Sequence, residues 1–200
     1  MIKPALYIYD RKSAASPADS ATLRKKVLAE HLDVLSEALT FSHGPHGKPH
    51  LSSHTEYDFS VSHSADIWAL VISSSAIGFD IERHKPRKMM DAIMSDRFHA
   101  DECAAYQALD NVSDREDLFF KLWTQKEAYG KLLGLGLQYD FSSQSFLAQA
   151  PQDIHIRTYK LCPYPDDTVF SLSLASSLPF TDIEVMGDFS MQDLILQAAL

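Results

Sequence analysis

Cysteine, basic residues and long hydrophobic runs are all scarce in this sequence. Its two cysteines, Cys103 and Cys162, form no Cys-x-x-Cys pair, so neither a zinc site nor a disulfide framework is indicated, and we expect two buried thiols. No stretch reaches the roughly 18 uninterrupted apolar residues of a membrane helix, and residues 1–5 lead into a strand-like run without a signal-peptide pattern. We therefore expect a cytoplasmic protein that does not enter a membrane.

The shortage of positive charge argues against a broad nucleic-acid-binding surface. The 18 lysines and arginines are outnumbered by 27 acidic residues, which gives a net charge of −9. Nucleic-acid binders usually have a basic stripe that neutralises many phosphates. Basic residues do gather in the segment RHKPRK at residues 83–88. Such a cluster is typical of a solvated charge run, and it could also receive one acidic protein or a small phosphorylated ligand.

Hydrophobic residues make up 46% of the 200 residues, which suits one large domain or two small halves that share a core. Runs of β-branched and aromatic residues predict strands at residues 5–9, 59–62, 67–72, 77–81, 154–161, 168–174 and 182–186. Helical periodicity predicts helices over residues 20–39, 92–109 and 113–133. Together these elements predict an α+β fold.

Two short segments hint at two similar halves. FSVSH at residues 59–63 and FSLSL at residues 170–174 resemble each other, and each follows a loop where a late strand would complete a helix-plus-sheet unit. Residues of these types are common in strands, so chance similarity is an equal alternative. We expect an N-terminal half of residues 1–75 and a C-terminal half of residues 76–200, packed as one compact pseudo-dimer.

The predicted helix over residues 113–133 has distinct surfaces. Ser113-x-x-Glu116 is a capping-box pattern, and Gly134 suits the position just beyond the last turn. One side is apolar, whereas the side with Glu127 and Lys131 also carries aromatic residues and glycine, which suggests that it borders a cleft. A polar arc is left over: Asp114, Asp117, Lys121, Thr124 and Gln125.

Simpler interpretations of the charged residues on this helix exist. Glu127 and Lys131 could form an exposed i,i+4 salt bridge, which contributes only about 0.2–0.5 kcal/mol. Lys126 falls near the apolar stripe, where its ammonium group must extend to water or find an anionic partner.

A pair of carboxylates occupies one face of the predicted strand at residues 77–82 (IGFDIE). Asp80 and Glu82 are two apart, so their side chains leave the same face of the strand and repel each other. A divalent cation relieves that repulsion, and Mg²⁺ is favoured because it takes oxygen ligands and keeps positions for phosphate and water. The alternative is a solvent-facing strand whose acidic residues only maintain solubility. If Glu127 and Lys131 converge on this strand, the residues indicate metal-assisted phosphoryl-group transfer.

Several segments, in the same order, resemble the 4′-phosphopantetheinyl transferase superfamily, and in particular its larger, surfactin-synthetase-activating type. They are GKP at residues 47–49, FSVSHS at 59–64, Trp68, IGFDIE at 77–82, LWTQKEAYGK at 122–131 and GLGL at 134–137. Each segment is short, but the ordered set is specific. About 90 residues are covered, and the separation between the acidic strand and the Lys-Glu helix matches the family as well.

The resemblance implies an activity and a set of site residues. A family member moves the phosphopantetheine arm of coenzyme A to a serine hydroxyl of an apo acyl or peptidyl carrier protein, and adenosine 3′,5′-bisphosphate leaves. Mg²⁺ on the pyrophosphate would be held by Asp80, Glu82 and Glu127 of the C-terminal half, with Glu127 and Lys131 as catalytic residues. The residues implied in coenzyme A binding are Lys48, Pro49, Ser62, His63, Lys126 and Lys131.

The resemblance is weakest near the N-terminus, where Arg24, Lys25 and Lys26 stand without a family motif around them. For the acidic carrier protein, we expect a docking patch that counters the net negative charge: Arg83, Lys85, Arg87, Lys88 and Met89. We expect a monomer that binds no nucleic acid. Two other functions stay open, namely a noncatalytic coenzyme A or carrier-binding module and a metal-dependent phosphodiesterase with water as nucleophile. The residues do not indicate which carrier protein or pathway is served.

Overall fold

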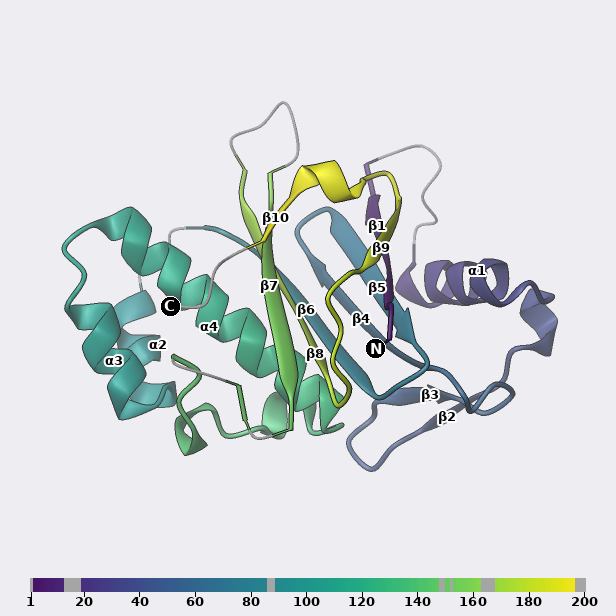
Figure 1. Ribbon diagram of the computed structural model, residues 1–200, viewed down its shortest axis with the longest axis horizontal. Helices are drawn as coiled ribbons and strands as arrows, with labels where there is room; N and C mark the ends of the chain where they lie inside the picture. The colour runs from purple at the N-terminus through teal and green to yellow at the C-terminus, as the bar shows by residue number, and fades with distance from the viewer. Residues whose placement is uncertain are drawn as a thin grey trace.

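The computed structural model describes residues 2–12, 19–85, 89–147, 150–151, 153–162 and 168–196, and two four-stranded sheets form its centre (Figure 1). The first sheet has the order β4-β5-β1-β9: Asp58–Ser64, Ile67–Ser73, Ala5–Asp10 and Glu184–Gly187. The second has the order β10-β7-β8-β6: Leu194–Leu196, His155–Leu161, Phe170–Ser176 and Ile77–Arg83. The predicted α+β class is confirmed, since helices flank these sheets.

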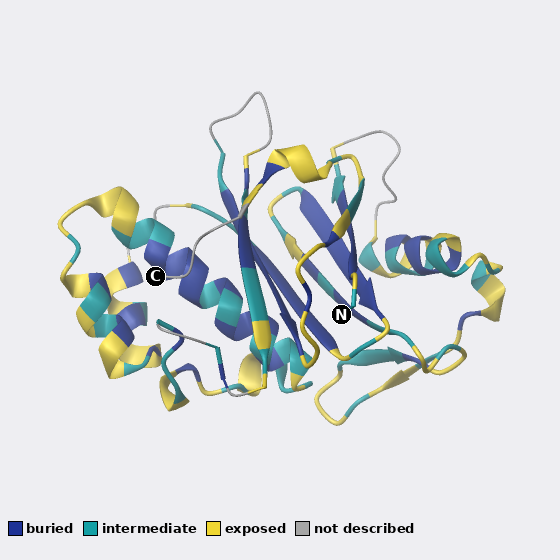
Figure 2. Cartoon of the chain, viewed as in Figure 1, coloured by how far each residue is buried: buried dark blue, intermediate teal, exposed yellow. Residues whose placement is uncertain are grey.

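The main core lies between the two sheets. Alternate residues of β1, β5, β6 and β8 fill it, and all of them are buried (Figure 2). Helix α1, Ser20–Leu32, packs on the outer side of the first sheet, and helix α4, Val112–Leu132, packs on the outer side of the second. The layers therefore run helix, sheet, sheet, helix (Figure 1).

The two sheets meet where β4 and β6 run side by side in the same direction. Side chains of β4 make the hydrogen bonds that a neighbouring backbone would make in a continuous sheet. The backbone N–H of Phe79 donates to Ser60 Oγ at 3.0 Å, and that of Arg83 donates to Ser64 Oγ at 3.0 Å. This junction fixes β4 against the acidic strand β6.

The predicted helix over residues 20–39 is wrong at its end. Helix α1 stops at Leu32 because Asp33 adopts the left-handed conformation, with φ 54°, and its amide closes the last turn. A short 3-10 turn, η1, follows at Ser36–Ala38. The strands predicted at residues 5–9, 59–62, 67–72 and 77–81 are all confirmed.

Two helices replace the single one predicted over residues 92–109: α2 at Met90–Arg97 and α3 at Ala100–Gln107. Phe98 and His99 are extended between them, and His99 caps α3 together with Glu102 in a capping box. The expected cap of α4 is also wrong, since Asn111 rather than Ser113 accepts the N-terminal hydrogen bond.

One surface of α4 differs from the expected pattern. Thr124 and Lys121, which were assigned to the leftover polar arc, are buried. Thr124 Oγ1 lies 2.8 Å from Ser173 Oγ of β8, so this arc faces the sheet. Hydroxyl groups at the helix–sheet contact satisfy one another there, which the helical pattern alone did not indicate.

Several short elements were not predicted. Strands β2, Phe41–His43, and β3, Pro49–Leu51, form a hairpin in a region where no strand or helix was predicted. Strand β10 was not expected either, and 3-10 turns occur at η2, Gly136–Gln138, η3, Phe141–Ser143, and η4, Met191–Asp193. Elements this short lack the length that a periodic pattern needs.

Strand β9 crosses back to pair with β1 in the first sheet, although in sequence it lies between β8 and β10 of the second sheet. The division into residues 1–75 and 76–200 stays a prediction. Cys103 and Cys162 are both free, and the expectation of two buried thiols is wrong, since Cys162 is exposed and Cys103 is only half-buried. Among the described residues, no helix combines the length and the apolar character needed to cross a bilayer.

Candidate functional site

Helix α4 lies directly on strand β6 because Gly78 has no side chain. A Cβ atom at this position would overlap the carbonyl oxygen of Ala128 and the amide nitrogen of Leu132. The close approach holds the polar face of α4 against the residues that follow Gly78 in β6. Asp80, Glu82, Glu127 and Lys131 are therefore assembled from one strand and one helix.

The centre of the site is a triangle of three polar groups. Lys131 Nζ of α4 donates to Asp80 Oδ1 at 2.7 Å and to Ser62 Oγ of β4 at 3.0 Å. Ser62 Oγ in turn donates to the same Asp80 oxygen at 2.8 Å. Three elements thus bring an ammonium, a hydroxyl and a carboxylate together, and Lys131 does not form the exposed i,i+4 pair with Glu127 that was the alternative.

Glu82 and Glu127 extend the negative charge beyond this triangle. Glu82 Oε2 accepts a hydrogen bond from Ser64 Oγ at 2.9 Å. Glu127 is buried, and burial together with the carboxylates of Asp80 and Glu82 raises its pKa to about 7, although Lys131 and Arg97 act in the opposite direction. A proton or a cation would each relieve the repulsion between these carboxylates.

The three carboxylates do not converge on one point as they stand. Within the described residues, no group of three His, Cys, Asp or Glu side chains is arranged to hold a metal ion. The ammonium of Lys131 occupies Asp80 Oδ1, whereas Asp80 Oδ2 is buried and has no hydrogen-bond partner. An unpartnered buried carboxylate oxygen is costly and fits the requirements of an oxygen-binding cation such as Mg²⁺.

A pocket of about 200 Å³ adjoins the triangle. Lys131, Gly134 and Gly136 line it from the end of α4, and Gly47, Lys48 and Pro49 line it from the β2–β3 hairpin. Residues 59–61 of β4 form its floor. The structure therefore brings Lys48 and Pro49 to the same hollow as Lys131. That the three residues bind one ligand stays a prediction.

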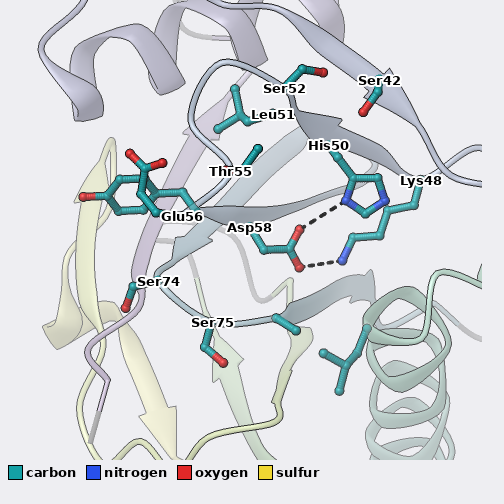
Figure 3. Close-up of a pocket in the computed structure, with 13 residues that line it drawn as sticks. Ser42, Lys48, His50, Leu51, Ser52, Thr55, Glu56, Asp58, Ser74 and Ser75 are labelled. Atoms are coloured by element: carbon teal, nitrogen blue, oxygen red, sulfur yellow. Dashed lines mark hydrogen bonds and ion pairs between the residues drawn. The ribbon is translucent and has the colours of Figure 1, made fainter.

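A second hollow, of about 610 Å³, lies on the other side of Lys48 (Figure 3). Lys48 Nζ donates to Asp58 Oδ2 at 2.7 Å and to the carbonyl oxygen of Ile77 at 3.0 Å. His50 Nδ1 lies 3.9 Å from Asp58 Oδ1. The ammonium of Lys48 is thus directed at the start of β4 and β6.

Two predicted site residues lie away from the triangle. His63 is exposed and sits on the face of β4 opposite to Ser62, because neighbouring residues of a strand alternate. Lys126 is completely buried and forms an ion pair with Glu102 at 3.1 Å. Its Nζ also donates to the carbonyl oxygen of Phe141 at 2.7 Å. Glu102 is therefore the anionic partner that the position of Lys126 required.

Sequence reasoning missed Asp58, Ser64 and Glu102. Ser64 belongs to the segment FSVSHS and lies two residues after Ser62, so strand alternation could have placed both serines on one face. Glu102 had no standard signal, because its capping box begins with His99 instead of Ser or Thr. Asp58 had no local signal, because its partners Lys48 and Ile77 become neighbours only when the hairpin folds onto β6.

The raised pKa of Glu127 predicts a loss of stability towards alkaline pH when no metal is present. Below about pH 4.5 the group is protonated in both states, and between about 4.5 and 7 the folded state binds more protons, so stability falls with rising pH by up to about 1.4 kcal/mol per unit. Thermal unfolding in EDTA should therefore show a lower Tm at pH 8 than at pH 5. Added Mg²⁺ should raise Tm more at pH 8 than at pH 5, because ligation requires deprotonated carboxylates.

A matched variant isolates this contribution. Glu127→Gln cannot titrate, so its Tm in EDTA should decline less between pH 5 and pH 8 than that of the wild type. A parallel decline in both proteins would assign the effect to other groups.

Comparison with known proteins points to one family. Residues 76–181 match the model of the 4′-phosphopantetheinyl transferase superfamily. The chain is 34% identical over 140 residues to a 4′-phosphopantetheinyl transferase of Bacillus pumilus, a match that covers 66% of this chain and 57% of that protein. It is 31% identical over 121 residues to one of Aneurinibacillus migulanus, with 60% and 49% covered. The transferase Sfp of Bacillus subtilis is 26% identical over 166 residues, with 78% and 73% covered. The chain thus spans about half the length of the first two relatives.

Proposed function

Because this chain belongs to the 4′-phosphopantetheinyl transferase superfamily, we propose that it moves the phosphopantetheine group of coenzyme A to a serine of an apo carrier protein. Adenosine 3′,5′-bisphosphate is the second product. The observation that carries the proposal is the triangle of Lys131, Asp80 and Ser62. Glu127 lies one turn before Lys131 on α4, and Lys131 also lines the adjoining pocket. An ammonium and a carboxylate cluster of this kind suit a diphosphate and its counter-ion.

In this proposal the donor occupies the pocket between the hairpin and the end of α4. Lys131 contacts the diphosphate, and Lys48 and Pro49 lie by the nucleotide. The joint role of Ser62 and His63 at the 3′-phosphate stays a prediction, because their side chains leave opposite faces of β4 and only Ser62 lies at the triangle. Lys126 does not contact the donor in this arrangement. Its buried ion pair with Glu102 instead holds α4 in place next to Glu127. Arg24 of α1 lies over the ring of Phe41 of β2 at 4.8 Å, and its Nε is buried without a hydrogen-bond partner.

We assign Mg²⁺ to Asp80, Glu82 and Glu127. The fit rests on their oxygen-only chemistry, on the unpartnered Oδ2 of Asp80, and on the burial of Glu127 near Asp80 and Glu82, which together raise its pKa. When bound, the ion would neutralise the diphosphate oxygens that repel an incoming hydroxyl group.

Glu127 is the proposed general base. Its carboxylate, directly or through a water molecule, accepts the proton of the carrier serine while the serine oxygen forms a bond to the β-phosphorus of coenzyme A. The bond from that phosphorus to the bridging oxygen breaks, and the bisphosphate departs with the electron pair. Lys131 neutralises charge on the diphosphate.

Mass spectrometry of an apo carrier protein incubated with coenzyme A and Mg²⁺ tests the proposal. Transfer adds one phosphopantetheine group to the carrier protein, and EDTA should abolish the addition. A carrier protein that stays unchanged, while coenzyme A binds, would indicate a noncatalytic binding module. Cleavage of coenzyme A without an adduct would indicate a phosphodiesterase. A panel of apo carriers of fatty-acid, polyketide and peptide synthesis would then identify the preferred substrate.

A basic docking patch is the proposed contact for the carrier protein. Lys85 and Met89 are exposed beside the end of β6, whereas Arg87 and Lys88 lie outside the described residues. The combined reversal Lys85→Glu, Arg87→Glu and Lys88→Glu should raise the KM for the carrier protein about tenfold or more, because like charges then face each other. Coenzyme A binding should stay nearly unchanged, and reversal of Lys3, an exposed lysine elsewhere, serves as the control. Equal carrier affinity in the triple variant would refute the patch.

We further propose that a single chain forms the complete site, with Ser62 from the N-terminal half and Asp80, Glu82 and Glu127 from the C-terminal half of a pseudo-dimer. The proposed state is a cytoplasmic monomer. Sedimentation at the concentration used for activity measurements tests the monomer.

A further inference from the structure

Asp58 joins three parts of the molecule at the start of β4. Its Oδ2 accepts hydrogen bonds from Lys48 Nζ of the hairpin at 2.7 Å and from the backbone N–H of Ile77 in β6 at 2.9 Å. Lys48 Nζ also donates to the carbonyl oxygen of Ile77 at 3.0 Å. The side chains of Lys48 and Asp58 are only 11% and 17% exposed, so this ion pair is largely shielded from water.

The hairpin that Lys48 belongs to has little other backbone support. Strands β2 and β3 have three residues each, and in the described part of the chain they form a two-stranded sheet separate from both larger sheets. Its turn is closed by the amide of Gly44 donating to the carbonyl oxygen of Lys48 at 2.8 Å. An isolated two-stranded hairpin is marginally stable in water. Packing of Phe41 on Phe59 supports its base, whereas the Lys48 ion pair supports its tip.

The tip of this hairpin is also one wall of the pocket of about 200 Å³. Gly47, Lys48 and Pro49 face Lys131 across it. Any opening of the hairpin would therefore remove one side of the proposed donor site without moving the carboxylates of β6 and α4.

We propose that Asp58 is a positioning residue, which latches the β2–β3 hairpin through Lys48 and so keeps the wall of the donor pocket in place. This inference rests on the proposed function, and it assigns the ammonium of Lys48 to Asp58 and Ile77 rather than to a phosphate group. Two of the three Nζ donors already have protein acceptors, and the charge is neutralised by Asp58.

The substitution Asp58→Asn tests the latch. The asparagine oxygen can still accept from the N–H of Ile77, but the charge that holds Lys48 is lost. If the wall is then closed for only about a tenth of the time, the apparent affinity falls in proportion. The KM for coenzyme A should rise about tenfold, while kcat at saturation stays within about twofold, because the catalytic cluster is untouched.

Dephospho-coenzyme A, which lacks the 3′-phosphate, separates the latch from a direct contact. A displaced wall should raise the KM for both donors by the same factor. If Lys48 instead served the 3′-phosphate, Asp58→Asn would free it, and the KM for coenzyme A would stay equal or fall. An unchanged or a lower KM for coenzyme A in Asp58→Asn would overturn the inference. A lower kcat at unchanged KM would overturn it as well.

Two further variants complete the experiment. Lys48→Met should raise the KM as Asp58→Asn does, and the double variant should be no worse than either single one, since both remove the same pair; additive effects would contradict the latch. Asp66→Asn, which breaks the exposed ion pair with Lys12, is the control and should leave both KM and kcat unchanged.

Direct titration with coenzyme A repeats the comparison without turnover. A wild type that binds but does not transfer refutes only the proposed activity, whereas one that binds no coenzyme A refutes both proposals.

Discussion

Replacement of Glu127 by glutamine is expected to lower the kcat for phosphopantetheine transfer by about 10²- to 10⁴-fold. Glutamine keeps the size and the hydrogen-bonding oxygen of the side chain, but it cannot accept the serine proton and is a weaker ligand for Mg²⁺. The dissociation constant for coenzyme A should change little, because Lys131 and the hairpin are retained. Steady-state transfer and calorimetric titration with coenzyme A measure the two effects separately.

Glu116→Gln is the matched control, since it makes the same change on the same helix, far from the carboxylate cluster. Its kcat should equal that of the wild type. If Glu127→Gln retained full turnover and an unchanged dependence on Mg²⁺, Glu127 would be neither the base nor a metal ligand, and the proton would have to leave by another route.

Replacement of Lys126 by methionine is expected to destabilise the fold by about 3–5 kcal/mol, because Glu102 would remain buried without its counter-ion. For a chain of this size, each kcal/mol corresponds to a shift in Tm of about 2–4 °C. Thermal and denaturant unfolding measure the loss. The double variant Lys126→Met, Glu102→Gln should recover much of it, since no unpaired charge is left.

Lys160→Met provides the comparison for this buried pair. Lys160 Nζ lies 2.7 Å from Asp117 Oδ2, but both side chains are partly exposed, so the cost should be below about 1 kcal/mol. A Lys126→Met protein as stable as Lys160→Met, with a raised KM for coenzyme A, would instead support a direct donor contact for Lys126.

The strand and helix that carry the site were predictable because each has a strong local pattern. In β6, apolar residues alternate with Gly78, Asp80 and Glu82, and the core accepts only the apolar face. In α4, a long periodic run ends before Gly134. The break between α2 and α3 was not predictable by the same means, since it depends on the cap formed by His99 and Glu102 and on the buried partner of Glu102.

The roles of three lysines also could not be predicted from local sequence alone. Lys48, Lys126 and Lys131 all carry one positive charge and all lie in motifs of the family resemblance. Tertiary contacts separate them: Lys131 meets Asp80 and Ser62, Lys126 meets Glu102, and Lys48 meets Asp58. Which carboxylate a lysine reaches depends on how elements that are distant in sequence pack together. Local composition does not determine the separation between the two charged groups.

By itself the sequence determined the α+β class, the acidic face of one strand, the charged face of one helix and the family, because these follow from side-chain periodicity and from the order of short motifs. Only the tertiary structure decided that Lys131 is the cation on Asp80, that Lys126 is buried with Glu102, and that a marginal hairpin is held by Asp58. The physical reason is that electrostatic pairing and burial depend on separations of a few ångströms between segments that only the packed core brings together.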